Sequence, residues 1–153
     1  MTDNFADGAG KPANEIRVVA AVITTGQSLL VVRKRRTSRF MLPGGKPESN
    51  EDDVACLTRE LREELSVEFD RGSAKFLGRF TADAANEPGE RVAARIYRVA
   101  PGSNPVLGAE IEEMLWLNCT QSIDQVALAP LVSEAVLPLL RTARRHAHRI
   151  GPE

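Results

Sequence analysis

The chain has 153 residues, of which 42% are hydrophobic, and its formal net charge at pH 7 is −1. This length is sufficient for one domain with one core and is short for two. The balanced charge argues against a general binder of nucleic acids or membrane surfaces. No apolar run in the sequence approaches the length that a bilayer-spanning helix needs.

The N-terminal residues 1–14 are polar and without periodicity, so we expect a disordered tail there and a single domain over residues 15–150. The tail also lacks the apolar stretch of a signal peptide, which favours a cytoplasmic protein. Cys56 and Cys119 are single and far apart, so they indicate neither a disulfide framework nor a Cys-x-x-Cys metal site. Two small buried thiols in a reducing compartment are expected instead.

Two nearly continuous apolar segments, residues 16–24 and 28–34, are predicted to be strands. Thr25, Gly26 and Gln27 separate them as a turn, so the two strands are expected to pair as a hairpin. Because both segments are apolar along almost their whole length, the sheet is expected to be covered on both faces.

Residues 44–65, GGKPESNEDDVACLTRELREEL, contain the first predicted helix. Ser49 or Asn50 is the expected N-cap, with acidic residues in the first turn. Apolar side chains at spacings of three and four mark the buried side of this helix: Val54, Leu57, Leu61 and Leu65.

The remainder of the chain predicts three further strands and a second helix. Strands are expected at 74–82 and 91–100, joined by a loop with a Pro-Gly turn signal, and at 114–118. Residues 131–149 have helical periodicity, and Pro138 is expected to kink that helix. Strands with helices packed against them indicate one α/β domain around a mixed sheet.

Three glutamates of the first predicted helix lie at helical spacing. Glu60, Glu63 and Glu64 share one face, so their carboxylates are expected to converge on a small volume and to repel one another. Mg²⁺ or Mn²⁺ would remove this penalty, because hard divalent cations prefer clustered carboxylate oxygens. The alternative is a solvated acidic face neutralised by arginines such as Arg59 and Arg62, and the bare triplet favours this alternative.

The residues around the triplet favour the cation. The pair Gly44-Gly45 allows the backbone to approach a ligand closely. One set of residues resembles, in type and spacing, the Nudix box of the MutT-like Nudix hydrolases, Gly-x5-Glu-x7-Arg-Glu-aliphatic-x-Glu-Glu-x-Gly-aliphatic: Gly45, Glu51, Arg59-Glu60-Leu61, Glu63-Glu64 and Val67.

Ser66 departs from this pattern, because the family has glycine at that position. The glycine ends the helix in the left-handed conformation, which serine adopts at a cost of about 1 kcal/mol. We expect slightly lower stability with the chemistry intact, since Ser66 supplies no metal ligand. Asn50 stands where many members have glycine, and asparagine is the next best residue for a left-handed conformation.

The resemblance implies the Nudix fold, an α/β/α sandwich around a mixed β-sheet, over about residues 16–140. It also implies hydrolysis of a nucleoside diphosphate linked to another group, with Mg²⁺ or Mn²⁺ as the cofactor. Arg59 would hold a carboxylate of the box through charge-assisted hydrogen bonds, and Glu51 would be partly structural and an outer-shell partner of the metal. Matched position by position, the implied metal ligands are the carbonyl of Gly44 and the side chains of Glu60, Glu63 and Glu64.

The resemblance leaves the general base open. In some members it is a glutamate of the box, and in others a glutamate of the loop that corresponds to residues 110–113 here. Glu110 is favoured, followed by Glu113, with a solvated acidic loop as the alternative. Lys46 and Arg35 are candidates for contacts with the phosphates of a nucleotide, with solvated side chains as the alternative.

For the substrate, elimination within the family favours a nucleoside triphosphate, cleaved to NMP and pyrophosphate, with oxidised nucleotides such as 8-oxo-dGTP included. ADP-ribose, a nucleotide sugar or the 5′ end of RNA as substrate, and a non-catalytic ligand sensor, are the alternatives left open. The expected partner is a small nucleotide. The basic segment 141–149 does not favour nucleic-acid binding, because no aromatic residues interleave its charges. A homodimer is frequent among relatives.

Overall fold

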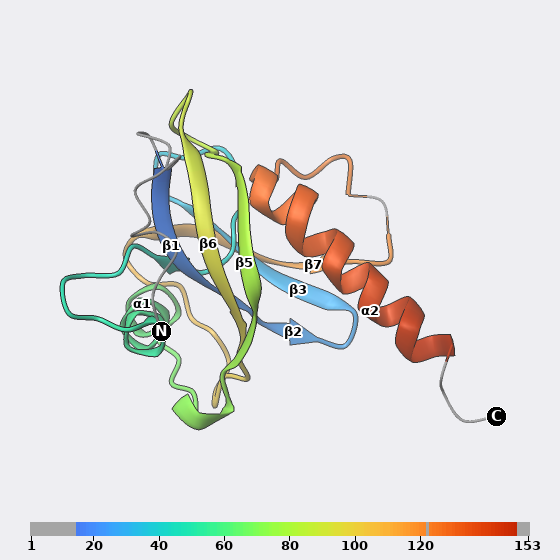
Figure 1. Ribbon diagram of the computed structural model, residues 1–153, viewed down its shortest axis with the longest axis horizontal. Coiled ribbons are helices and arrows are strands. Elements are labelled where there is room, and N and C mark those ends of the chain that lie inside the picture. Colours follow the sequence, from blue (N-terminus) through green and yellow to red (C-terminus); the bar gives the residue numbers. More distant parts are fainter. Residues whose placement is uncertain (1–14, 122, 150–153) are drawn as a thin grey trace, which may run out of the picture.

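The computed structural model describes residues 15–121 and 123–149, with side chains up to residue 143 in the last helix. Its first sheet is mixed. It contains four strands in the order β4-β1-β6-β5, with β1 parallel to β6 and antiparallel to β4 (Figure 1). The bounds of these strands are β1 (Glu15–Val22), β4 (Gly44–Gly45), β5 (Lys75–Asp83) and β6 (Arg91–Arg98). The tail expected at residues 1–14 and the last residue of the expected domain lie outside the described residues.

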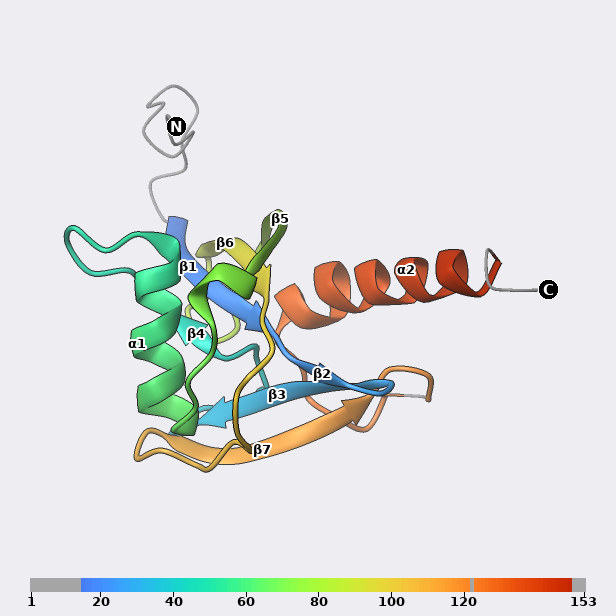
Figure 2. The same ribbon diagram turned by 90° about the horizontal axis from the view of Figure 1, so that it is seen from below.

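A second, antiparallel sheet lies beside the first, in the order β2-β3-β7. Helices α1 and α2 lie on opposite sides of the sheets, as both views show (Figures 1 and 2). This arrangement confirms the expected α/β/α sandwich around a mixed sheet. The remaining bounds are β2 (Thr24–Thr25), β3 (Ser28–Lys34), α1 (Asp53–Leu65), the 3₁₀ turn η2 (Arg71–Ser73), β7 (Ile111–Asn118), the π-helix η3 (Leu131–Val136) and α2 (Leu137–Arg149).

Alternate residues of the central strands enter two separate hydrophobic clusters. In β1, Ala20 and Val22 pack in the cluster that α2 and η3 cover, whereas Val19 and Ala21 pack in the cluster that α1 covers. Strand β3 divides its side chains between the same two clusters. The prediction that both apolar segments are covered on both faces is therefore confirmed.

The predicted hairpin is shorter than expected, because the first apolar segment changes sheet. Only Thr24 and Thr25 pair with the start of β3, and the amide of Leu30 donates to the carbonyl of Ile23 at 2.9 Å. Strand β1 itself pairs with β4 and β6 in the other sheet. The segment therefore divides at Ile23: its apolar part, β1, joins the mixed sheet, and only Thr24 and Thr25 join the antiparallel sheet.

The N-cap of α1 is Asp52, so the prediction of Ser49 or Asn50 is wrong. The Asp52 carboxylate accepts a hydrogen bond from the amide of Ala55 at 2.8 Å. Asn50 instead lies in a turn before the helix, with a left-handed φ of 66°. The side chain of Glu51 closes that turn by accepting from the amide of Glu48 at 2.8 Å, which delays the helix start.

The second predicted helix begins as a π-helix and continues as α2. The amide of Leu137 donates to the carbonyl of Val132, five residues earlier, directly before Pro138. Because Pro138 lacks an amide hydrogen, it cannot make the next helical bond, and the wider π turn absorbs this loss. Strand β7 begins at Ile111, three residues before its predicted start. Cys56 and Cys119 are both buried thiols, as expected.

Among the described helices, none combines the length and the apolar character that crossing a bilayer requires.

The C-cap of α1 generates a prediction about stability. Ser66 has φ 56° and ψ 33°, the left-handed conformation expected for the family's glycine. Ser66→Gly should relieve about 1–2 kcal/mol of backbone strain and lose about 0.4–1 kcal/mol to the entropy of the unfolded chain. The free energy of unfolding should therefore rise by roughly 0.5–1 kcal/mol, and Tm by about 1–4 °C in calorimetry.

Ser49→Gly is the matched control, because Ser49 is exposed and is not among the residues with positive φ. This substitution should lower stability slightly, since only the entropic effect remains. Equal changes in both variants would show that the left-handed conformation of Ser66 carries no strain.

Candidate functional site

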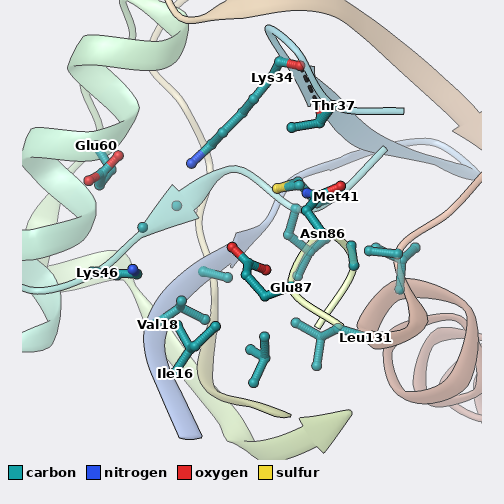
Figure 3. A pocket seen from close by; sticks show the side chains of 18 of the residues that line it. Ile16, Val18, Lys34, Thr37, Met41, Lys46, Glu60, Asn86, Glu87 and Leu131 are labelled. Carbon is teal, nitrogen blue, oxygen red and sulfur yellow. Dashed lines mark hydrogen bonds between the residues drawn. The ribbon is translucent and has the colours of Figure 1, made fainter. Parts of the chain in front are cut away.

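A cavity of about 630 Å³ opens between the mixed sheet, the glycine pair of β4 and the π-helix η3 (Figure 3). One part of its wall is aliphatic and is formed by side chains such as Ile16, Val18 and Leu131. Polar and charged side chains form the rest: Lys34, Thr37, Lys46, Glu48, Arg59, Glu60, Asp83, Asn86 and Glu87. The cavity thus combines an apolar surface with ionisable groups, which is typical of ligand sites.

The two glycines of β4 let the carboxylate of Glu60 approach the backbone. Gly44 has φ 143°, and a Cβ there would overlap the carbonyl oxygen of Val19 on the neighbouring strand. A Cβ on Gly45 would overlap the carboxylate of Glu60. In this structure the group that approaches the glycine pair closely is the side chain of Glu60.

Arg59 holds the carboxylates of the site together. Its Nε lies 2.7 Å from Oε2 of Glu51 and its Nη2 lies 2.9 Å from Oε1, which is a bidentate pair. Its Nη1 donates to Glu60 at 2.9 Å. The hydrogen bonds from Arg59 lower the pKa of Glu51 to about 2, and in turn Glu51 raises the pKa of the guanidinium. The resemblance implied this contact between Arg59 and a carboxylate of the box.

Glu64 is a buried carboxylate, 3% exposed, at the back of the site. Its Oε1 accepts from the amide of Gly44 at 3.2 Å, and its Oε2 lies 3.4 Å from Nζ of Lys34. Burial raises the pKa of Glu64 to about 7, against the opposing effects of Lys34 and the Gly44 amide. The neighbouring Glu60 raises it further, so two carboxylates share this small volume.

The expected convergence of all three carboxylates is not found. Glu63 is 60% exposed at its side chain and lies 3.5 Å from Nη1 of Arg59. Among the side chains that the structure describes, those of residues 15–121 and 123–143, no three from Asp, Glu, His or Cys lie close enough together to hold a metal ion. Arg59 takes the place that a cation would have, because its Nη1 donates to Glu60 at 2.9 Å and to Glu63 at 3.5 Å.

The residues present nevertheless fit Mg²⁺ or Mn²⁺. Glu60 and Glu64 lie next to each other, one lining the cavity and the other buried behind it. The missing Cβ of Gly45 leaves room for the Glu60 carboxylate against the backbone. Carboxylate and backbone carbonyl oxygens are the ligands that these hard cations prefer, and Glu60, Glu64 and Gly44 supply both kinds.

Lys34 faces the cavity, whereas the sequence analysis favoured Arg35. Arg35 does not line the cavity; its Nε donates to the carbonyl of Ala109 at 2.6 Å and its Nη1 to Glu112 at 3.1 Å. Side chains alternate across a strand, so Lys34, the last residue of β3, lies on the opposite side from Arg33, whereas Arg35 belongs to the turn that follows. That alternation was the sequence signal that singles out Lys34. Lys46, the other predicted phosphate contact, does line the cavity.

The acidic residues at 110–113, named as candidates for the general base, lie away from the cavity. Glu113 forms an ion pair with Arg33 at 2.8 Å, and Glu112 with Arg35 at 3.1 Å. The backbone carbonyl of Glu110 accepts a hydrogen bond from the amide of Arg35 at 2.9 Å. Of the described residues, none from this segment lines the cavity.

Asn86 and Glu87 line the cavity from the loop between β5 and β6, and sequence reasoning missed both. That loop was identified only by its Pro-Gly turn signal. No local pattern could have placed it beside β1 and η3, because the loop reaches them through the pairing of the strands.

The contact between Gly45 and Glu60 generates a prediction about metal affinity. Gly45→Ala should displace the flexible end of Glu60 and weaken Mn²⁺ binding by about tenfold, a typical effect of disturbing a ligand's support. Isothermal titration calorimetry with Mn²⁺ measures this change. Gly72→Ala is the control, because a Cβ there would meet only the Asp70 side chain at 3.6 Å. Unchanged affinity in a folded Gly45→Ala variant would exclude Glu60 from the metal site.

The lowered pKa of Glu51 generates a prediction about pH. A carboxyl whose pKa falls from 4.5 to about 2 on folding stabilises the folded state above pH 4.5, and this contribution is lost as the pH falls towards 2. Glu51→Gln should therefore be less stable than the wild type at pH 7, with the difference shrinking below pH 4.5. Urea unfolding at pH 7, 4 and 3 tests this expectation. Glu48→Gln is the control, since Glu48 is exposed and lies 3.7 Å from Arg59. If the difference in stability between Glu51→Gln and the wild type did not change with pH, this expectation would be refuted.

Comparison with known proteins agrees with the fold. The model of the NUDIX domain family matches residues 14–140. No curated protein matches the sequence. A MutT NUDIX hydrolase from Burkholderia pseudomallei is similar in structure, with a TM-score of 0.64 and 19% identity over 82% of this chain and 95% of that chain.

Two further solved structures show the same fold. The MutT protein from Methanosarcina mazei Go1 has a TM-score of 0.65 and 19% identity, covering 86% of this chain and 94% of that one. A UDP-X diphosphatase has a TM-score of 0.65 and 15% identity, covering 93% of this chain and 68% of that one. Because the family model covers most of the sequence, the chain belongs to the Nudix family, whose hydrolases act on pyrophosphate bonds.

Proposed function

We propose that the protein hydrolyses a nucleoside triphosphate, NTP or dNTP, to NMP and pyrophosphate in the cytoplasm, with Mg²⁺ or Mn²⁺ as its cofactor. Oxidised nucleotides such as 8-oxo-dGTP belong to the same proposed class. The proposal rests on one observation: the charged and the aliphatic side chains that line the cavity lie on different sides of it. Lys34, Lys46 and Glu60 lie towards one side of it, and aliphatic side chains such as Ile16 and Leu131 lie towards the other (Figure 3).

The charged side suits a polyphosphate. Lys34 and Lys46 are cations that line the cavity, and each can donate hydrogen bonds to phosphate oxygens. Lys34 is also within 3.4 Å of the buried Glu64, so its ammonium is held at the back of the site. The aliphatic side suits the nucleoside, because a base and a ribose bury apolar surface there.

Glu60, Glu64 and the carbonyl of Gly44 would hold the cation, with Glu63 joining them if its side chain turns away from Arg59. When bound, such a cation neutralises phosphate charge and lowers the pKa of a water molecule. Arg59 orients Glu60 and Glu51 through its hydrogen bonds. The glutamates of the Nudix box are the favoured proton acceptors, because the candidates at residues 110–113 do not line the cavity.

The test is product analysis with NTPs, dNTPs, 8-oxo-dGTP, ADP-ribose and UDP-sugars in the presence of Mg²⁺. A triphosphate should yield NMP, with phosphate appearing only after inorganic pyrophosphatase is added. Glu60→Gln should lower kcat by at least about 100-fold, since removal of a charged ligand disturbs the whole site. Glu68→Gln is the control on an acidic residue that pairs with Arg62 outside the cavity.

Three outcomes would overturn the proposal. Cleavage of ADP-ribose or UDP-sugars without cleavage of any triphosphate would place the substrate among the other nucleoside diphosphate derivatives. Binding of nucleotides without turnover would indicate a ligand sensor. Turnover of triphosphorylated RNA in preference to free nucleotides would indicate an RNA 5′-end pyrophosphohydrolase.

A further inference from the structure

The loop between β5 and β6 brings a carboxylate into the cavity. Glu87 lines the cavity, and its side chain points into it (Figure 3). Two backbone hydrogen bonds order the loop, from the amide of Ala84 to the carbonyl of Glu90 at 2.9 Å and from the amide of Glu90 to the carbonyl of Glu87 at 3.1 Å. Glu87 is therefore held at a defined place on the rim.

Glu87 differs from the other acidic side chains that line the cavity. Glu48 and Glu60 form ion pairs with Arg59, and Asp83 forms one with Arg91. Within the described part of the chain, the Glu87 carboxylate has neither a hydrogen-bond donor nor a cation as its partner. The chain has a free acceptor here, directed at the ligand's space.

The surroundings of Glu87 indicate what kind of group it meets. The aliphatic wall of Ile16, Val18 and Leu131 is where the nucleoside would be bound, and no aromatic ring occurs among the described residues that line the cavity. These lining residues therefore do not form an aromatic cage of the kind that binds ammonium groups. A nucleobase packed on the aliphatic wall would instead present its hydrogen-bonding edge to the loop.

A carboxylate only accepts hydrogen bonds, so it selects a base that presents donors. Guanine presents two adjacent donors, N1–H and the 2-amino group, which match the two oxygens of a carboxylate. Adenine and cytosine place an acceptor nitrogen beside their amino group, and uracil and thymine flank N3–H with carbonyls. The neighbouring Asn86 both donates and accepts, so its amide does not discriminate in this way.

We infer that Glu87 is the specificity-determining residue of this site and selects guanine nucleotides by accepting hydrogen bonds from N1–H and the 2-amino group. The inference rests on the proposed function, because it assigns the apolar side of the cavity to the base. Glu87 is exposed at the rim, so water competes for its hydrogen bonds and moderates the preference. A preference of about tenfold per hydrogen bond corresponds to about 1.4 kcal/mol.

Steady-state kinetics with GTP, ITP and ATP tests this inference, because ITP differs from GTP only in lacking the 2-amino group. The wild type should prefer GTP over ITP by about tenfold in kcat/KM, and over ATP by more. Glu87→Gln should abolish most of this preference, mainly through KM. Glu90→Gln is the matched control, since Glu90 belongs to the same loop and does not line this cavity; its preference should equal that of the wild type.

Binding without turnover separates this inference from the proposed function. Titration calorimetry with GMP, IMP and AMP in the absence of metal should give the same order of affinity, and Glu87→Gln should remove it. If no triphosphate is cleaved but GMP binds in this order, the proposed reaction fails and the inference stands. Equal affinity for GMP and AMP would overturn it. An equal loss of turnover for all three triphosphates in Glu87→Gln would also overturn it, because Glu87 would then act on the chemistry.

Discussion

The cost of placing carboxylates close together is the constraint on which the rest of this structure depends. Glu64 is buried beside Glu60, and burial alone favours protonation over charge. Two basic side chains of the protein compensate part of this cost. Arg59 binds Glu51 and Glu60 on the cavity side, and Lys34 reaches Glu64 from β3. Under the proposed function, a divalent cation would add to this compensation.

Holding two carboxylates in one place requires a rigid support, and the two hydrophobic clusters provide it. Helix α1 packs against the sheets through Leu57, Leu61 and Leu65, which are fully buried. Glu60 and Glu64 adjoin this apolar stripe, because they follow Leu57 and Leu61 by three residues and Glu64 is itself buried. Strand β4 is short because its two glycines must fit between β1 and that carboxylate. The core and the site therefore use adjoining faces of the same helix.

The features that could be predicted are those that depend on residues close together in the sequence. The left-handed Ser66 and Asn50, and the pairing of Arg59 with a box carboxylate, depend on residues within one segment, and each is found. The division of the first apolar segment at Ile23 depends on partners distant in sequence and was not foreseen. The position of Lys34 follows from strand alternation, which the sequence analysis did not apply to the run of basic residues. Glu87 reaches the site only through the pairing of β5 with β6.

The charges along the cavity also restrict how a nucleotide can be oriented. Phosphate groups are attracted to Lys34 and Lys46 and repelled by the unpaired Glu87 on the loop. A triphosphate bound in reverse would place its charges beside Glu87 and bury its base against the lysines, which loses both interactions. One orientation is therefore selected by repulsion as well as by attraction. Because the repelling group lies on a loop and the carboxylates of the proposed metal site lie on a helix, a substitution in the loop can alter selectivity without changing the helix.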